Sequence, residues 1–161
     1  IAQLIKANAD IKIKVVQKDE FEKGDRKLLN FGHTLGHALE NQYELSHGQA
    51  ISIGMTYACE LSSQEVGFKK TQDVVNLLAQ YQLPTYAHFN TKKALKVLQH
   101  DKKTQQDFVN YILLQKIGKG VICKISFHFY LCIYFCKCKC FFLTQKNIFR
   151  KLFKHGFYNC V

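Results

Sequence analysis

Polar side chains recur near residue 30 at intervals of three or four, in the order Arg26, Asn30, His33 and His37. At helical pitch this spacing places them on one face of a single helix, and His47 follows ten residues after the last of them. Neutral imidazoles are common ligands of divalent metal ions, and a planar guanidinium suits carboxylate or phosphate. The pattern predicts a metal or phosphate site, against the alternative of surface or satisfied core histidines.

Two glycines, Gly32 and Gly36, lie beside these histidines. Each costs roughly 1 kcal/mol relative to alanine inside a helix, so their placement predicts close approach by a ligand or by another helix. Ser46 and Gln49 fit a capping box, which would begin a second helix at His47. Apolar residues then continue at helical spacing through Ile51, Met55, Ala58 and Leu61 or Ser62.

These residues resemble a known family. The run GDRKLLNFGHTLGHALE from Gly24 to Glu40, followed by HGQA from His47, closely resembles the C-terminal domain of 3-dehydroquinate synthase. Further matching segments follow the family's order: Lys12 to Glu20, Gly54-Met55, Leu83-Pro84 and His100 to Lys103. The similarity extends over residues 1–122. It implies a mainly α-helical domain with a small β-hairpin, and it leaves the family's N-terminal nucleotide-binding α/β domain outside this fragment.

The resemblance implies an NAD- and metal-dependent carbon–oxygen lyase of the shikimate pathway. Such enzymes convert 3-deoxy-arabino-heptulosonate 7-phosphate to 3-dehydroquinate and phosphate, with bound NAD and a divalent metal, zinc or cobalt. A secondary alcohol is transiently oxidised, phosphate leaves, and ring opening and aldol closure follow. We expect NAD to be held mainly by the N-terminal domain, the complete enzyme to be a cytoplasmic homodimer, and no nucleic-acid or membrane partner.

By the same resemblance, His33 and His47 are metal ligands, and His37 contacts the substrate phosphate and assists proton transfer. The expected catalytic residues are His37 and Lys12. The expected substrate-binding residues are Arg26, Asn30, His37, Lys12 and one of Lys102 and Lys103, with the choice within that lysine pair left open.

Two departures from the family pattern bear on function. Gln49 stands where many members have glutamate, and because a capping box accepts either residue we expect the fold to survive. The third metal ligand, a glutamate in the family, should lie upstream of Ile1. Catalytic zinc sites usually have three protein ligands and an open position, so we expect the chain alone not to catalyse the full reaction.

The remaining elements follow from periodicity and turn residues. A helix is predicted over residues 1–17, although Asn8 interrupts its apolar stripe of Leu4, Ile5, Ile11, Val15 and Val16. A second helix is predicted over residues 70–81, with Val74, Leu77, Leu78 and Tyr81 on one side and Leu83-Pro84 ending it. Thr91 is predicted to cap a short helix through Leu98, and residues 108–114 and 121–125 to form a hairpin across residues 118–120.

Composition changes after the hairpin turn. Residues 1–120 carry sixteen basic and twelve acidic side chains, whereas residues 121–161 carry seven basic and none acidic, so the tail supplies most of the net charge of +11. We expect residues 1–122 to form one domain and 123–161 a poorly ordered tail. A membrane helix is disfavoured by Lys137 and Lys139. The alternatives are a soft-metal site at Cys136, Cys138 and Cys140, or translation of AT-rich DNA beyond a frameshift or unspliced boundary.

Other functions remain open from sequence. Related sugar phosphate cyclases and metal-dependent alcohol dehydrogenases of similar architecture are the nearest enzyme alternatives. A non-enzymatic remnant that binds metal or phosphate weakly is the alternative of a different class. Cys59, the only cysteine before residue 121, fits a reducing cytosol.

Overall fold

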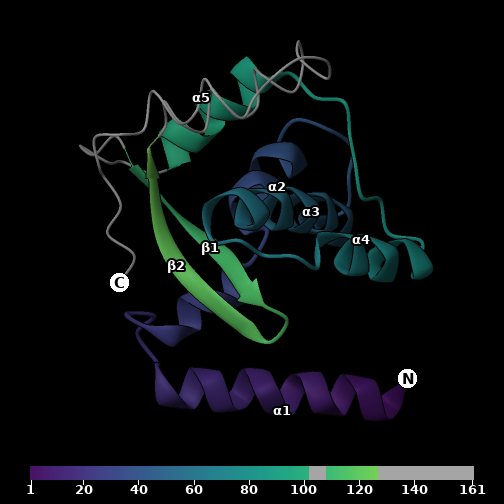
Figure 1. Ribbon diagram of the computed structural model, residues 1–161, viewed down its shortest axis with the longest axis vertical. Helices are drawn as coiled ribbons and strands as arrows, with labels where there is room; N and C mark the ends of the chain where they lie inside the picture. The colour runs from purple at the N-terminus through teal and green to yellow at the C-terminus, as the bar shows by residue number, and fades with distance from the viewer. Residues whose placement is uncertain (102–107, 127–161) are drawn as a thin grey trace.

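The computed structural model describes residues 1–101 and 108–126 (Figure 1). The elements of these ranges are α1 (Ala2–Lys18), η1 (Asp25–Asn30, a 3-10 helix), α2 (His33–Glu40), α3 (His47–Glu65), α4 (Thr71–Gln80), α5 (Thr91–Asp101), β1 (Phe108–Lys116) and β2 (Lys119–Ser126). The expected fold class, mainly helical with a small β-hairpin, is confirmed.

Helix α3 forms the centre of the structure. It packs against α2 on one side and against β1 and α4 on others, while α5 contacts α2. The core between these elements contains apolar side chains that are each at most 5% exposed: Leu35, Ala38, Leu39, Ala50, Ile53, Leu61, Ala94, Leu98, Val109, Leu113 and Ile125. Burying a leucine, isoleucine or valine side chain stabilises a domain by roughly 1.5–3 kcal/mol, so the core fixes α2 on α3.

Strands β1 and β2 form an antiparallel hairpin in which Val109 pairs with Ile125 and Tyr111 with Cys123. These four side chains are buried, as expected where alternate residues of a strand face the core. Gly118 takes a φ of 79° in the turn. Strand β2 continues to Ser126, so residues 123–126 belong to the folded hairpin rather than to the expected tail. Residues 127–161, including the rest of that tail, lie outside the described residues.

Helix α1 confirms the predicted N-terminal helix, but none of its residues is buried. Its main neighbour is η1, and Figure 1 shows it lying apart from α2 and α3. Leu4, Ile5 and Ile11 are 58%, 63% and 60% exposed. Asn8, which interrupts the apolar stripe, donates a hydrogen bond from Nδ2 to the Leu4 carbonyl oxygen at 2.8 Å and so is accommodated within the helix.

Two details of the remaining helices differ from expectation. Helix α4 forms where predicted, but its expected apolar side is not buried, with Leu77 54% exposed. Helix α5 begins at Thr91, yet the cap comes from the preceding residue, because Asn90 Oδ1 accepts a hydrogen bond from Lys93 N at 3.1 Å. Asparagine is as good a cap as threonine, so the cap lies one residue before the position predicted from sequence.

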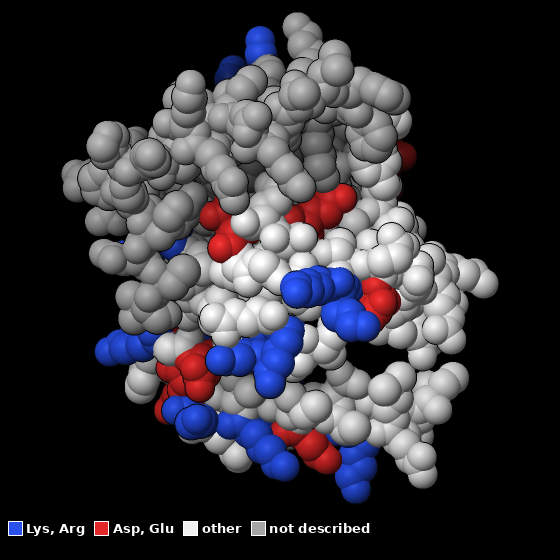
Figure 2. All heavy atoms as spheres, in the orientation of Figure 1, with Lys and Arg blue, Asp and Glu red and all other residues white. Residues whose placement is uncertain are grey.

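The charged surface is mixed in sign. On the face drawn in Figure 2, Lys and Arg side chains gather over the lower part, with Asp and Glu among them. Lys18 Nζ and Asp25 Oδ2 form an ion pair at 3.5 Å with both side chains largely exposed, so the pair contributes little to stability. Among the residues described, no helix combines the length and apolarity needed to cross a bilayer.

Candidate metal centre

The polar stripe predicted for one helix is divided between two elements. Arg26 and Asn30 belong to η1, and α2 begins only at His33. The chain breaks between them because Phe31 is extended, with ψ of 124°, and Gly32 takes the left-handed conformation with φ of 81°. A residue without a Cβ adopts that conformation at little cost. The expectation of a single helix through residues 26–40 is therefore wrong.

The glycines next to the histidines allow α2 to approach α3. A Cβ on Gly36 would lie 2.6 Å from Ile51 Cδ1, and one on Gly54 would lie 2.0 Å from the Gly32 carbonyl oxygen. Such separations are far below van der Waals contact. Of the two explanations that the sequence left open for Gly32 and Gly36, the structure shows close approach by another helix.

Helix α3 begins with the predicted capping box. Ser46 Oγ accepts a hydrogen bond from Gln49 N at 3.4 Å, and Gln49 Oε1 accepts one from Ser46 N at 2.9 Å. Gln49 thus serves in the box where many family members were expected to have glutamate. His47 follows the cap directly and occupies the first turn of α3, facing the C-terminal half of α2.

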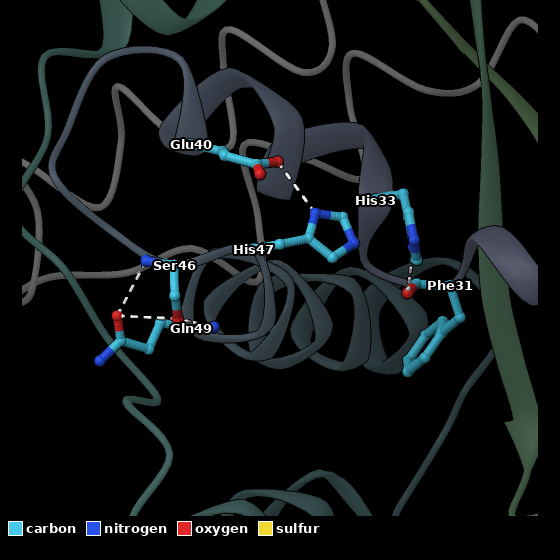
Figure 3. Close-up of polar contacts among 6 residues, drawn as sticks. All are labelled: Phe31, His33, Glu40, Ser46, His47 and Gln49. Carbon is cyan, nitrogen blue, oxygen red and sulfur yellow. Dashed lines mark hydrogen bonds and ion pairs between the residues drawn. The ribbon is translucent and has the colours of Figure 1, made fainter.

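The two helices bring three imidazoles together, of which Figure 3 draws those of His33 and His47. The ring centroids of His33 and His37, one turn apart on α2, lie 5.2 Å from each other. The ring of His47, from α3, lies 5.6 Å from that of His33 and 5.9 Å from that of His37. The predicted pair, His33 and His47, therefore converges from separate elements, and His37 completes a triangle.

Two of the three rings are held through their Nδ1 atoms. His33 Nδ1 lies 3.3 Å from the Phe31 carbonyl oxygen, and His47 Nδ1 lies 3.0 Å from Glu40 Oε2. A carbonyl and a carboxylate only accept hydrogen bonds, so each Nδ1 is the donor of its bond, and in the neutral ring Nε2 is then the nitrogen with the lone pair. Figure 3 shows the second nitrogen of His47 on the side of His33.

Burial favours the neutral form of one ring. The pKa of His33 lies below its ordinary value of 6.5, chiefly because partial burial disfavours the charged ring, and His37 and His47 lower it further. The hydrogen bond to Phe31 acts in the opposite direction. A neutral imidazole is the form that binds metal ions, so His33 is available as a ligand near neutral pH.

Glu40 is the residue that sequence reasoning missed. One ligand atom each from His37, Glu40 and His47 lies within 4.8 Å of the others. The signal was present, because Glu40 is one helical turn after His37 and two turns after His33. The structure thus brings together four side chains that could bind a metal ion, with His33 beside the group of His37, Glu40 and His47, and it does not by itself divide them into ligands and supporting residues.

Arg26 and Asn30 contact the segment that follows α1. Arg26 Nη1 donates to the Glu20 carbonyl oxygen, and Asn30 Nδ2 donates to Glu22 Oε1 at 2.6 Å. Asp19 organises this segment, since its carboxylate accepts hydrogen bonds from three backbone N–H groups, those of Lys23, Gly24 and Arg26. The bonds from Arg26 N and Gly24 N lower the pKa of Asp19.

Of the three predicted lysines, the structure describes Lys12. It is exposed on α1, whose main neighbour is η1. Lys102 and Lys103 lie outside the described residues. Their expected roles, like those of Arg26 and Asn30, therefore stay predictions.

Comparison with known proteins decides the family. The family model described as 3-dehydroquinate synthase C-terminal matches residues 1–104. The chain belongs to the 3-dehydroquinate synthase C-terminal family. It is 47% identical over 128 residues to a 3-dehydroquinate synthase of Methylacidiphilum infernorum, covering 75% of this chain and 36% of that protein. It is 42% identical over 129 residues to one of Thermosynechococcus vestitus, covering 75% of this chain and 35% of the relative.

A solved structure shares the fold of this 3-dehydroquinate synthase C-terminal domain. It is a 2-deoxy-scyllo-inosose synthase complexed with carbaglucose-6-phosphate, NAD⁺ and Co²⁺, with a TM-score of 0.65 and 24% sequence identity over 74% of this chain and 37% of that one. At this identity the likeness shows the fold alone. The chain spans about a third of the length of the curated relatives that it matches.

Proposed function

We propose that this chain supplies the metal- and substrate-binding part of a 3-dehydroquinate synthase, which forms 3-dehydroquinate and phosphate from 3-deoxy-arabino-heptulosonate 7-phosphate with NAD. One observation carries the proposal: His33, His37 and His47 converge from two helices with ring centroids 5.2 to 5.9 Å apart. Family membership supports it, because a sugar acid phosphate substrate presents hydroxyl and anionic groups that suit such a site.

The donor set fits a divalent cation such as Zn²⁺ or Co²⁺. His33 and His47 each have Nδ1 engaged by an acceptor, the arrangement commonly found for metal-binding histidines, and both would hold the ion through Nε2. When bound, the metal would act as a Lewis acid on the substrate hydroxyls. Two histidines leave room for a further protein ligand and for substrate oxygen atoms.

The side chains around this centre have roles in binding the substrate and moving protons. His37 is exposed on the same face of α2, where its imidazole can contact the phosphate and exchange a proton with it. Arg26 now bonds to a neutral carbonyl oxygen, and an anionic substrate group would be a stronger acceptor. We place Asn30, Lys12 and one of Lys102 and Lys103 in the same binding role. The cytosol is the proposed compartment.

A chimaera tests the activity. The part of the Methylacidiphilum infernorum relative that matches this chain is replaced by this chain, and phosphate release and 3-dehydroquinate formation are measured with NAD and either Zn²⁺ or Co²⁺. Matched chimaeras carry His33→Ala, His47→Ala, or His88→Ala at an exposed histidine outside the cluster. We expect turnover in the unsubstituted chimaera and in H88A, and its loss in H33A and H47A.

The same chimaera separates the alternatives. A folded chimaera that binds Co²⁺ and does not release phosphate would refute the proposed reaction and favour a remnant that only binds metal. Offering carbaglucose-6-phosphate, the compound bound to the structural neighbour, as a competitor tests for a related sugar phosphate cyclase. If carbaglucose-6-phosphate inhibits more strongly than 3-dehydroquinate, the related cyclase function is favoured.

A further inference from the structure

Glu40 links the last turn of α2 to the first turn of α3. Its Oε2 lies 3.0 Å from Nδ1 of His47, and its side chain is 34% exposed while that of His47 is 56% exposed. Nδ1 of this half-exposed imidazole has the Glu40 carboxylate as its hydrogen-bond partner. The carboxylate can therefore select which ring nitrogen of His47 carries the proton.

The bond to Glu40 has a counterpart at the other ligand. His33 donates from Nδ1 to the Phe31 carbonyl oxygen, and His47 donates from Nδ1 to Glu40. Both rings thus use the same nitrogen, one toward the backbone and the other toward a side chain. In the neutral rings this leaves Nε2 as the nitrogen with the lone pair, on two rings whose centroids are 5.6 Å apart.

Glu40 has two possible roles. Its carboxylate lies close enough to His37 and His47 to be a metal ligand itself. In a ligand role a carboxylate oxygen would coordinate the cation directly, whether or not Oε2 keeps its hydrogen bond with His47 Nδ1. A positioning role keeps that bond and directs Nε2 of His47 toward His33.

We propose that Glu40 is a positioning residue that holds His47 in the Nδ1–H tautomer, so that His47 binds the cation through Nε2, and that Glu40 is not itself a ligand. The matching use of Nδ1 at His33 favours this role over direct coordination. Groups of this kind typically change metal affinity by 10- to 100-fold. The inference rests on the metal centre of the proposed function, but the tautomer can be measured without metal.

The first experiment reads the tautomer of His47 in the metal-free chain at pH 8.5 by long-range ¹H–¹⁵N NMR of the histidine rings. We expect Nδ1–H in the unsubstituted chain and in Glu40→Gln, since an amide oxygen still accepts the bond. In Glu40→Ala we expect a shift toward Nε2–H. Glu44→Ala, which removes an exposed carboxylate from the loop after α2, is the control and should leave the tautomer unchanged.

The second experiment titrates Co²⁺ into the same four proteins by calorimetry, with far-ultraviolet circular dichroism to confirm folding. Glu40→Ala should weaken binding about 10- to 100-fold, as loss of such a partner typically does, while Glu44→Ala should not. Glu40→Gln should weaken it by no more than about threefold, because it keeps the acceptor. Equal weakening by E40Q and E40A would overturn the proposal in favour of Glu40 as a ligand.

The two readouts distinguish failure of this inference from failure of the proposed function. An Nδ1–H tautomer that persists in Glu40→Ala would overturn the positioning role whether or not the chain binds metal. Because the third ligand is expected upstream of Ile1, absence of Co²⁺ binding in the unsubstituted chimaera would overturn the metal centre, and the NMR result would then show independently whether Glu40 sets the tautomer of His47.

Discussion

The backbone of Gly54 lies so close to that of Gly32 that a Cβ on Gly54 would stand 2.0 Å from the Gly32 carbonyl oxygen. Gly32 immediately precedes α2, and Gly54 lies two turns into α3. This contact sets the separation of the two helices at the point where His33 emerges. The geometry of the three imidazoles therefore depends on two residues that have no side chains.

Adding a methyl group at this contact should disrupt it. We expect Gly54→Ala to lower the free energy of unfolding by about 1–3 kcal/mol or more, the usual range for overpacking, and to weaken Co²⁺ binding as the helices separate. Urea denaturation and metal titration would measure both effects. Gly48→Ala is the matched control, because its Cβ would meet no atom within 4 Å. That variant should be as stable or up to about 1 kcal/mol more stable.

A buried hydroxyl joins α3 to the hairpin. Ser62 Oγ donates to the Ala58 carbonyl oxygen at 2.6 Å and accepts a hydrogen bond from Leu114 N at 2.8 Å, with none of the residue exposed. Ser62→Ala would leave the Leu114 N–H without this acceptor, so we expect a loss of about 1–3 kcal/mol in the free energy of unfolding. Ser63→Ala changes the exposed neighbour and should change stability little. Equal stability of the two variants would contradict this account.

The sequence predicted much of the fold because the signals were local. Helical periodicity identified α1, α3 and α4. The Ser46–Gln49 capping box predicted that α3 begins at His47, which is where it begins in the structure. The break between η1 and α2 was missed, because Gly32 in the left-handed conformation looks the same in sequence as a tolerated glycine within a helix. Its conformation depends on contact with Gly54, which lies on another helix.

The sequence also predicted part of the candidate site and missed the rest. His33, His37 and His47 were identified from residue type, helical spacing and family resemblance, and the structure brings them together. Glu40 has the same helical spacing from His37 and His33, but it was missed because its partner, His47, lies on another helix, and spacing along α2 does not show that contact. The contacts of Arg26 and Asn30 with residues 20–22 depend on a turn held by Asp19, which spacing alone did not indicate.

The capping box should tolerate a change toward the expected family residue. In Gln49→Glu the side chain can still accept the Ser46 N–H bond, and its charge lies near the positive end of the α3 dipole. We expect unfolding free energy to be unchanged or higher by about 0.3–1 kcal/mol. Ser46→Ala removes the cap and should lower it by about 0.5–2 kcal/mol. Thermal unfolding would measure both, and a destabilised Gln49→Glu would contradict the expectation.

Cys59 should be chemically inert in the folded chain. It is fully buried, and burial raises its pKa to about 12, so the reactive thiolate is scarce at pH 8. Iodoacetamide at pH 8, followed by peptide mass spectrometry, should leave Cys59 unmodified in buffer and alkylate it fully in 8 M urea, roughly the upper limit used for unfolding. Rapid alkylation of Cys59 in buffer, with circular dichroism unchanged, would show that the core around α3 opens without unfolding.

Acid should destabilise the metal-free chain through His33. The pKa of His33 is lowered from 6.5 in the folded chain, mainly by burial, so below pH 6.5 the unfolded chain binds a proton that the folded chain does not. The free energy of unfolding should therefore fall as the pH is lowered through 6.5, and it should level off below the folded pKa. Urea denaturation between pH 8 and pH 5 in the presence of a chelator would measure this slope.

His33→Gln should flatten the dependence of unfolding free energy on pH, whereas His88→Gln, at an exposed histidine, should not. If His33→Gln retains the full slope, another group is responsible for the acid sensitivity.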